Sequence, residues 1–283
     1  MEIRENHKEI MIKKASGKME AFNLVKLKAS LERAGAGADS IDIIVRDIES
    51  WVQDGVSTRE LYDRAFKTLK RISTSGAILY RLKQAIISMG PSGFPFEHFI
   101  GELFKRQGYR VEVGVVVEGA SVSHEMDVIA TKANEQILAE CKYSVKQGHS
   151  VSIQVPLYVN SRVIDIVEKL HEDRRNQDTK YSAWIVTNGR FSPDSVKYSK
   201  CKGINLLGWD YPAGNALKDL IERQKMYPIT ILGSITVNEK KELMRRGIVT
   251  CDLLSEQVDQ WDDLGLSKRK QASVLRELTA LCS

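Results

Sequence analysis

The sequence predicts an α/β protein in which a mixed β-sheet with helices on its faces lies between two mainly helical segments. From about Gly90 to Leu220, helical and strand periodicities alternate in the order α-β-β-β-α-β-α-β. Before and after this stretch, apolar residues recur mostly at helical spacing. A Gly- and Pro-rich stretch, GPSGFP (90–95), breaks the first segment from the second. We therefore expect domains at 1–89, 94–223 and 228–283.

Composition narrows the class of protein. A chain of 283 residues can build two or three hydrophobic cores. It has no apolar run of the roughly 18 residues that would span a membrane, and its N-terminus, MEIRENHKEIMIKK, is too charged for a secretory signal. The four cysteines form no C-x-x-C pair, which argues against a zinc site and fits a reducing cytoplasm. The net charge of +5 permits a polyanionic partner without requiring one.

The first segment reads as a small hairpin followed by helices. EIMIKKASGKMEAF (9–22) alternates on both sides of a turn at ASGK, and Thr58 is placed to cap a later helix. The expected helices are 24–35, 40–55, 59–73 and 75–90.

The middle segment contains the sheet. A helix over 95–109 presents an apolar stripe, and a second long helix is expected around 153–171. The remaining expected elements are strands at 110–119, 124–131, 136–144, 181–188 and 204–210, and a helix at 192–203.

Charged side chains lie inside two of these strands, in HEMDVIATKANEQILAECKYS (124–144). Alternate residues of a strand share a face, so Glu140 and Lys142 point the same way. If the two strands form a hairpin, Asp127 converges with Glu140. Two such carboxylates repel each other unless a cation lies between them, and Mg²⁺ or Mn²⁺ prefers oxygen ligands. Lys142 can then hold an attacking water or the charge on a phosphate, which suits phosphodiester hydrolysis.

A salt bridge on a solvated sheet face would explain the same three residues. The pattern D-x(n)-E-x-K nevertheless resembles the PD-(D/E)xK nucleases, most closely their Mrr-type restriction-endonuclease branch, over about Phe94 to Leu220. The resemblance implies a restriction-endonuclease-like fold, DNA as substrate, and Asp127 and Glu140 as metal ligands helped by Glu97. It also implies that QVPLY supplies Gln154 and Tyr158 on one side of a helix, like the Q-x-x-x-Y of RecB-like nucleases.

The sequence departs from that family at two places. Met126 replaces the proline before Asp127, and Pro156 lies within Q-x-x-x-Y, so the helix must begin close by and hold Pro156 in its first turn. His124 could bind or support a metal, but a structural role is favoured for a histidine at this position.

The first segment resembles an ATP-cone, the regulatory nucleotide-binding module of ribonucleotide reductases. Lysines near a helix N-terminus attract a triphosphate, because their charge adds to that of unpaired backbone N–H groups. We expect ATP or dATP to bind without hydrolysis, since no Walker-type loop is present. A solvated basic face is the alternative. The implied nucleotide-binding residues are Lys13, Lys14, Glu20, Asn23, Lys26 and Leu27, with Thr58 and Tyr62 on a later helix.

The last segment contains two stretches, 236–256 and 258–282, that each read as helix, Gly-containing turn and helix. Such units can contact DNA phosphates without reading sequence. The alternative is a helical brace packed on the sheet. The basic candidates are Arg245, Arg246, Lys268, Arg269 and Lys270, and the candidate core residues are Leu253, Leu254, Leu264 and Leu266.

These observations together predict a Mg²⁺-dependent endonuclease controlled by nucleotide binding. A homo-oligomer is consistent with it, because cutting both DNA strands needs two active sites. One rival is a nucleotide-responsive DNA-binding protein that has lost catalysis, although it has no need of the Asp127, Glu140 and Lys142 set. A second is an accessory regulator of ribonucleotide reductase, which leaves the middle segment unexplained.

Overall fold

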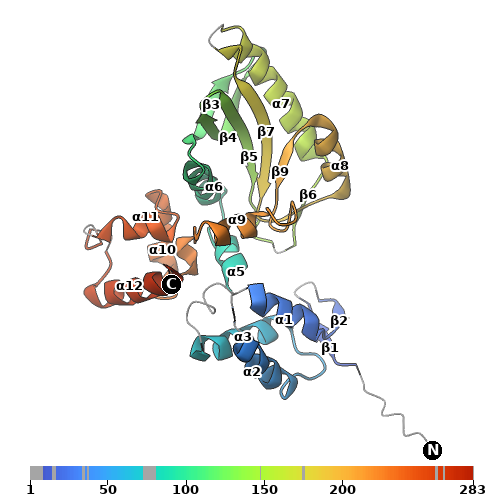
Figure 1. Ribbon diagram of the computed structural model, residues 1–283, viewed down its shortest axis with the longest axis vertical. Helices are drawn as coiled ribbons and strands as arrows, with labels where there is room; N and C mark the ends of the chain where they lie inside the picture. The colour runs from blue at the N-terminus through green and yellow to red at the C-terminus, as the bar shows by residue number, and fades with distance from the viewer. Residues whose placement is uncertain are drawn as a thin grey trace, which may run out of the picture. The chain divides into compact units, whose positions relative to one another are not determined.

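The computed structural model describes residues 9–14, 17–33, 36, 38–72, 81–146, 148–173, 176–258, 261–263 and 265–282 (Figure 1). The chain separates into two compact units, Met1–Leu82 with Leu275–Ser283, and Lys83–Val274. Across the described part of the chain, no helix combines the length and apolarity needed to cross a membrane.

In its described residues, the first unit contains the predicted two-stranded hairpin, the first three of the four predicted helices, and the end of a C-terminal helix. Leu31, Ile44, Ile48 and Leu69 are fully buried in its core. The pairing of Lys13 with Ser57 places the start of the third helix beside the hairpin. The elements are β1 (Met11–Lys13), β2 (Met19–Ala21), α1 (Leu24–Arg33), α2 (Ala38–Glu49) and α3 (Thr58–Ile72).

The predicted cap of α3 is wrong by one residue. Ser57, not Thr58, precedes the helix, and its Oγ accepts a hydrogen bond from the Glu60 N–H at 3.2 Å. The Glu60 carboxylate accepts in return from the Ser57 backbone N–H at 2.8 Å. This capping box requires a Glu three residues after the cap, a spacing that Ser57 has and Thr58 lacks.

Two other expectations fall partly on positions that the structure does not describe. Residues 15 and 16 of the hairpin turn, and residues 75–80 of the predicted fourth helix, lie outside the described residues. The described remainder of that helix is α5 (Leu82–Ile87).

The second unit is built on the predicted mixed sheet. Its five strands run in the order β3-β4-β5-β7-β9. The pairs β3–β4 and β4–β5 are antiparallel, and β5–β7 and β7–β9 are parallel. The elements are α6 (Phe94–Arg106), β3 (Arg110–Glu118), β4 (Ser123–Lys132), β5 (Glu135–Lys142), α7 (Gln154–His171), β7 (Lys180–Thr187), α8 (Pro193–Lys202) and β9 (Asn205–Leu207).

Helices cover both faces of this sheet (Figure 1). On β7, Trp184 meets the ring of Phe104 from α6, with ring centroids 5.8 Å apart. The next residue, Ile185, packs with Val159 of α7. Successive side chains of a strand point to opposite faces, so α6 and α7 lie on opposite sides.

Three parallel strands end together at one edge of the sheet, which we call the carboxyl edge. Lys142 at the end of β5 pairs with Thr187 at the end of β7, and Val186 pairs with Leu207 at the end of β9. Beside this edge, two short strands pair in parallel: β6 (Ser150–Val151) and β8 (Arg190–Phe191). Side chains near the strand ends therefore gather there.

The C-terminal part of the chain is helical. Its first half forms the predicted helix–turn–helix, α10 (Val237–Arg245) and α11 (Cys251–Ser255), with Gly247 in the left-handed region at φ +79°. In its second half, residues 261–263 form a turn where a helix was expected, residues 259 and 260 lie outside the described residues, and the second predicted helix is α12 (Lys268–Cys282). Leu264 lies outside the described residues. Before these helices come α9 (Leu217–Arg223) and a short 3-10 helix, Ile229–Ile231.

Replacing Leu103 by alanine tests the contact of α6 with the sheet. Leu103 is 0% exposed, so the change should leave a cavity and lower the free energy of unfolding by about 2–5 kcal/mol. Urea unfolding would measure the loss. Val116→Ala on β3 is the matched control, because Val116 is 65% exposed and its truncation should change little. Equal effects of the two variants would contradict the assigned core.

Candidate active site

The candidate site begins where β4 and β5 diverge. Val128 pairs with Ala139, and one step further along the hairpin come Asp127 and Glu140. In place of a backbone acceptor, Asp127 Oδ2 accepts the N–H of Cys141 at 2.6 Å. The two carboxylates therefore sit at the same level on neighbouring strands.

Glu140 is a buried carboxylate, 3% exposed, and is bound on both oxygens. Its Oε1 accepts hydrogen bonds from Lys142 Nζ at 2.5 Å and from the Tyr158 hydroxyl at 2.7 Å. Its Oε2 forms an ion pair with Arg162 Nη1 at 2.6 Å. Burial of a carboxylate is costly without such partners, and Lys142, Tyr158 and Arg162 supply them to both oxygens of Glu140.

Arg162 is the site residue that the sequence analysis missed. It follows Tyr158 by four residues on α7, and its guanidinium lies 5.2 Å from the centre of the Tyr158 ring. It also donates to the Glu125 carbonyl at 3.2 Å. The available signal was the i, i+4 spacing of Tyr158 and Arg162, which places both on one side of a helix.

Lys142 is held in its charged form. Burial alone would lower the pKa of its ammonium, but hydrogen bonds to Glu140 and Tyr158 raise that pKa above its ordinary value. Lys142 thus has no free electron pair with which to take a proton. It can act only as a positive charge and a hydrogen-bond donor.

Glu97 and Asp127 differ from Lys142, because their surroundings disfavour the charged form of each carboxyl group. Burial, with the charges of Asp127, Glu125 and Glu140, raises the pKa of Glu97 to about 7. Burial, with the charge of Glu140, raises the pKa of Asp127 to about 6. Glu97 lies in the first turn of α6, so this helix brings a third carboxylate toward the hairpin. The cluster has more negative charge than its neighbours neutralise.

Glycine at position 93 makes room for Glu97. A Cβ atom on Gly93 would lie 2.6 Å from Glu97 Oε1, which is closer than any real side chain approaches. A side chain here would push the Glu97 carboxylate away from its present position.

Of the pair Gln154 and Tyr158, Tyr158 is the residue with a described contact to the carboxylates. Helix α7 begins at Gln154 and holds Pro156 in its first turn, as the sequence predicted. Tyr158 reaches Glu140, but Gln154 is exposed, and its Oε1 accepts from the Ser152 hydroxyl at 2.8 Å. No described contact joins Gln154 to the carboxylates.

His124 is tied elsewhere. Its Nε2 lies 2.7 Å from Asp165 Oδ2 on α7. Asp165 Oδ1 also accepts from the Ser121 backbone N–H at 2.9 Å, and the Ala120 N–H donates to the Asp165 carbonyl at 2.9 Å. The favoured structural role fits these contacts, because they fasten the β3–β4 turn to α7.

A hard cation fits one part of this cluster. The raised pKa values of Asp127 and Glu97 show two carboxylates that lack a counter-charge, and their oxygens are the donors that Mg²⁺ and Mn²⁺ prefer. Both oxygens of Glu140 are already bound by other side chains. Glu140 could therefore be a further ligand only by sharing an oxygen between the cation and Lys142 or Arg162. Over the residues that the structure describes, no three His, Cys, Asp or Glu side chains are already arranged to hold a metal ion.

In the first unit, Lys14 of the hairpin and Lys26 of α1 are both paired with Glu20. Its carboxylate forms ion pairs with Lys14 and, at 2.5 Å, with Lys26, and these hydrogen bonds lower the pKa of Glu20 to about 2. Asn23 Oδ1 accepts the Lys26 backbone N–H at 3.1 Å, so Asn23 closes the start of α1. Lys13 is exposed nearby.

The other three residues of the predicted nucleotide site are half-buried. Leu27 packs against the core of the first unit. Thr58 and Tyr62 are half-buried, one turn apart on α3.

Most of the basic C-terminal candidates have acidic partners. Arg245 and Arg246 both pair with Glu242, at 2.9 and 2.8 Å. Lys268 pairs with Asp262 and Lys270 with Glu239. Of the predicted core residues, Leu254 and Leu266 are buried and Leu253 is half-buried. Exposed ion pairs of this kind open at little cost, so both a DNA contact and a brace stay compatible with the structure.

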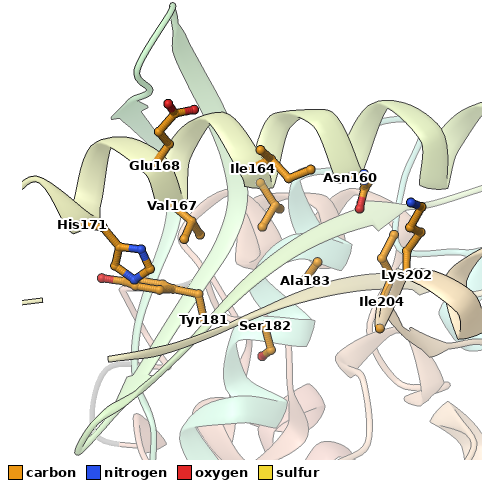
Figure 2. A pocket seen from close by; sticks show the side chains of 12 residues that line it. Asn160, Ile164, Val167, Glu168, His171, Tyr181, Ser182, Ala183, Lys202 and Ile204 are labelled. Atoms are coloured by element: carbon orange, nitrogen blue, oxygen red, sulfur yellow. The ribbon is translucent and has the colours of Figure 1, made fainter. Parts of the chain in front are cut away.

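A separate hollow lies between α7 and β7 and has a volume of about 440 Å³ (Figure 2). Its walls are largely apolar, with Ile164, Val167 and Ile204, and polar groups such as His171 and Lys202 stand at its margin. None of the predicted site residues lines it.

The chain is similar to known proteins over most of its length after residue 89. A family model described as restriction endonuclease (Mrr_cat) matches residues 90–213, and one described as AF1548-like, C-terminal, matches 227–282. An uncharacterized protein of Archaeoglobus fulgidus is 32% identical over 183 residues, which are 63% of this chain and 97% of that protein. The chain belongs to the AF1548 family.

The AF1548 crystal structure, titled as a protein of unknown function, aligns with a TM-score of 0.55 at 30% identity. The alignment covers 66% of this chain and 97% of AF1548. The restriction endonuclease MspJI, solved with a 27-mer oligonucleotide, aligns with a TM-score of only 0.27 at 13% identity over 85% of this chain and 48% of MspJI.

This family member therefore has a restriction-endonuclease-like domain, which suggests a nuclease. The domain match contains the whole carboxylate cluster. Neither family model includes residues 1–89, so the resemblance of the first unit to an ATP-cone stays a prediction.

The uncompensated carboxylates predict a pH-dependent stability. The pKa values of Asp127 and Glu97 in the folded protein are raised, to about 6 and about 7. The two groups therefore add to the free energy of unfolding below about pH 4, and this addition is lost as the pH rises through those pKa values. The Tm should therefore fall between about pH 4 and pH 8. Glu97→Gln should reduce the fall, and a thermal melt at each pH would measure it. Glu112→Gln, an exposed change on β3, is the control and should follow the wild type.

Proposed function

We propose that this protein is a Mg²⁺- or Mn²⁺-dependent deoxyribonuclease that hydrolyses DNA phosphodiester bonds. The observation that carries the proposal is the grouping of Asp127, Glu140 and Lys142 on one hairpin inside the restriction-endonuclease match. A charged lysine beside uncompensated carboxylates suits a reaction in which a cation and a phosphate must meet.

The carboxylates would hold the cation. Asp127 and Glu97 have raised pKa values, so a divalent ion would replace protons that they otherwise take up near neutral pH. Glu140 would join them as a ligand. When bound, the ion would lower the pKa of a bound water and neutralise charge on the scissile phosphate.

Lys142 would position the reacting groups. Its ammonium is charged, and at Nζ it can donate hydrogen bonds to the attacking water and to a phosphate oxygen. The proton released by that water must pass elsewhere, because Lys142 cannot accept it. Arg162 would hold the Glu140 carboxylate in its orientation, and the exposed amide of Gln154 would face the nucleic acid at the start of α7.

The Lys142→Ala variant tests this proposal directly. Loss of one positioned charge should lower kcat by about 10²–10³-fold while the fold is kept. Cleavage of supercoiled and linear DNA with Mg²⁺ or Mn²⁺ would measure it, and Lys180→Ala, at the opposite end of β7, is the matched control.

Asp127→Ala separates the rival function from this one. A nuclease should lose metal-dependent cleavage in that variant. A non-catalytic DNA-binding protein would show no cleavage with any metal in the wild type, and its DNA binding would change little in the variant. Full activity of Lys142→Ala would contradict the assigned role of Lys142.

We also propose that the first unit binds ATP or dATP and thereby controls cleavage, through domain packing or oligomeric state. Lys14 and Lys26 converge on Glu20, so a triphosphate would exchange one carboxylate for several phosphate oxygens between the same two lysines. Lys13 is exposed beside them, and the start of α1 supplies backbone N–H groups.

The Lys14→Ala variant tests nucleotide binding. Removing one charged partner of the triphosphate should weaken ATP or dATP affinity by about tenfold or more, measured by isothermal titration calorimetry. Lys28→Ala, an exposed change on α1, should keep the wild-type affinity. Equal cleavage by the wild type with and without each nucleotide would remove the regulatory proposal and leave the nuclease intact.

A further inference from the structure

The loop that follows β7 is locked beside the active strand. Thr187 Oγ1 donates to the Lys142 carbonyl at 2.6 Å. Asn188 then binds both backbone groups of Ser144, accepting from its N–H at 2.9 Å and donating to its carbonyl at 2.8 Å. The chain that leaves β7 therefore stays next to the chain that leaves β5.

Gly189 lets this loop come close to the loop that ends at His149, directly before β6. A Cβ atom on Gly189 would lie 2.5 Å from the His149 carbonyl oxygen, so a side chain would force the two loops apart. Directly after Gly189, Arg190 pairs with Ser150, and Arg190 is exposed. A cation is thus placed three residues beyond Thr187, which itself pairs with Lys142.

Further cations gather at the same edge around Asp210, which follows β9. Lys218 Nζ binds Asp210 Oδ1 at 2.8 Å. Burial alone would raise the pKa of Asp210, but Lys218, Lys83 and Arg190 lower it below its ordinary value. The Lys83 ammonium also lies 5.5 Å from the centre of the Trp209 ring. The Trp209 backbone N–H donates to the Gly189 carbonyl at 3.0 Å, which brings the neighbouring residues Asp210 and Arg190 together. Arg190, Lys218 and Lys83 therefore lie at this edge of the sheet.

We propose that Arg190, Lys218 and Lys83 form a phosphate-binding strip for the nucleic-acid strand that enters the active site. The inference rests on the proposed nuclease function and adds where the substrate backbone runs. The strip continues from Lys142 across the ends of β7 and β9, so it would bind phosphates that flank the scissile one.

The charge balance favours a polyanion over an isolated anion. Several cations grouped at one edge can bind successive phosphates of a nucleic-acid backbone, and each phosphate contact releases a counterion. Contacts of this kind set register and affinity but carry no sequence information. Substitutions of Arg190, Lys218 or Lys83 would therefore weaken substrate binding and leave the chemical step unchanged.

The test is the salt dependence of DNA binding. A fluorescein-labelled duplex is titrated with the full chain, without metal, by anisotropy at several salt concentrations. Arg190→Gln and Lys218→Gln should each weaken binding and reduce the slope of log Kd against log salt by about 1. Arg190→Lys should keep the slope, because it keeps the charge. Lys180→Gln, at the amino end of β7, is the matched control and should behave as the wild type.

Cleavage by the same proteins distinguishes the two proposals. An increased KM with unchanged kcat in Arg190→Gln and Lys218→Gln supports the strip. If the wild type binds and cuts DNA while these variants match Lys180→Gln, the strip is wrong and the nuclease stands. If the wild type neither binds nor cuts any DNA with any metal, the nuclease proposal fails and the strip fails with it.

Discussion

The buried charge of Glu140 is the constraint around which the second unit is arranged. A carboxylate at 3% exposure needs partners on both oxygens, and these come from β5 itself and from two turns of α7. The ion pair with Arg162 and the hydrogen bond from Tyr158 thereby join α7 to β5. Asp127 accepts one backbone N–H, from Cys141, and burial together with neighbouring carboxylates raises the pKa of both Asp127 and Glu97.

Part of this site could be predicted because strand geometry is local. The alternation of side chains in a strand and the short hairpin bring Asp127 beside Glu140 without knowledge of the rest of the fold. Arg162 could not be predicted in the same way. It lies 22 residues after Glu140 and reaches it only because α7 crosses the face of the sheet. Its charge alone resembles that of any exposed helical arginine.

Other differences between sequence and structure have similar causes. Ser57 and Thr58 are both good caps, and only the position of Glu60 decides between them. A second helix was expected before α12, but residues 261–263 form a turn, and the Trp261 indole N–H donates to the Leu254 carbonyl at 2.8 Å. The Trp261 side chain is buried and held by this contact, and the backbone at Trp261 forms a turn in place of the expected helix. The five-stranded sheet was predictable because its strands are long or strongly apolar.

Cys141 gives the site a further property. The strand that carries Glu140 and Lys142 places Cys141 between them, and successive side chains point to opposite faces. Cys141 is buried, and burial raises the pKa of its thiol well above the ordinary value. The sulfur is therefore kept protonated and turned away from the carboxylates. The pleat of one strand thus gives the carboxylate cluster Glu140 and Lys142 from β5 and withholds the thiol between them, so β5 offers no sulfur ligand on that face.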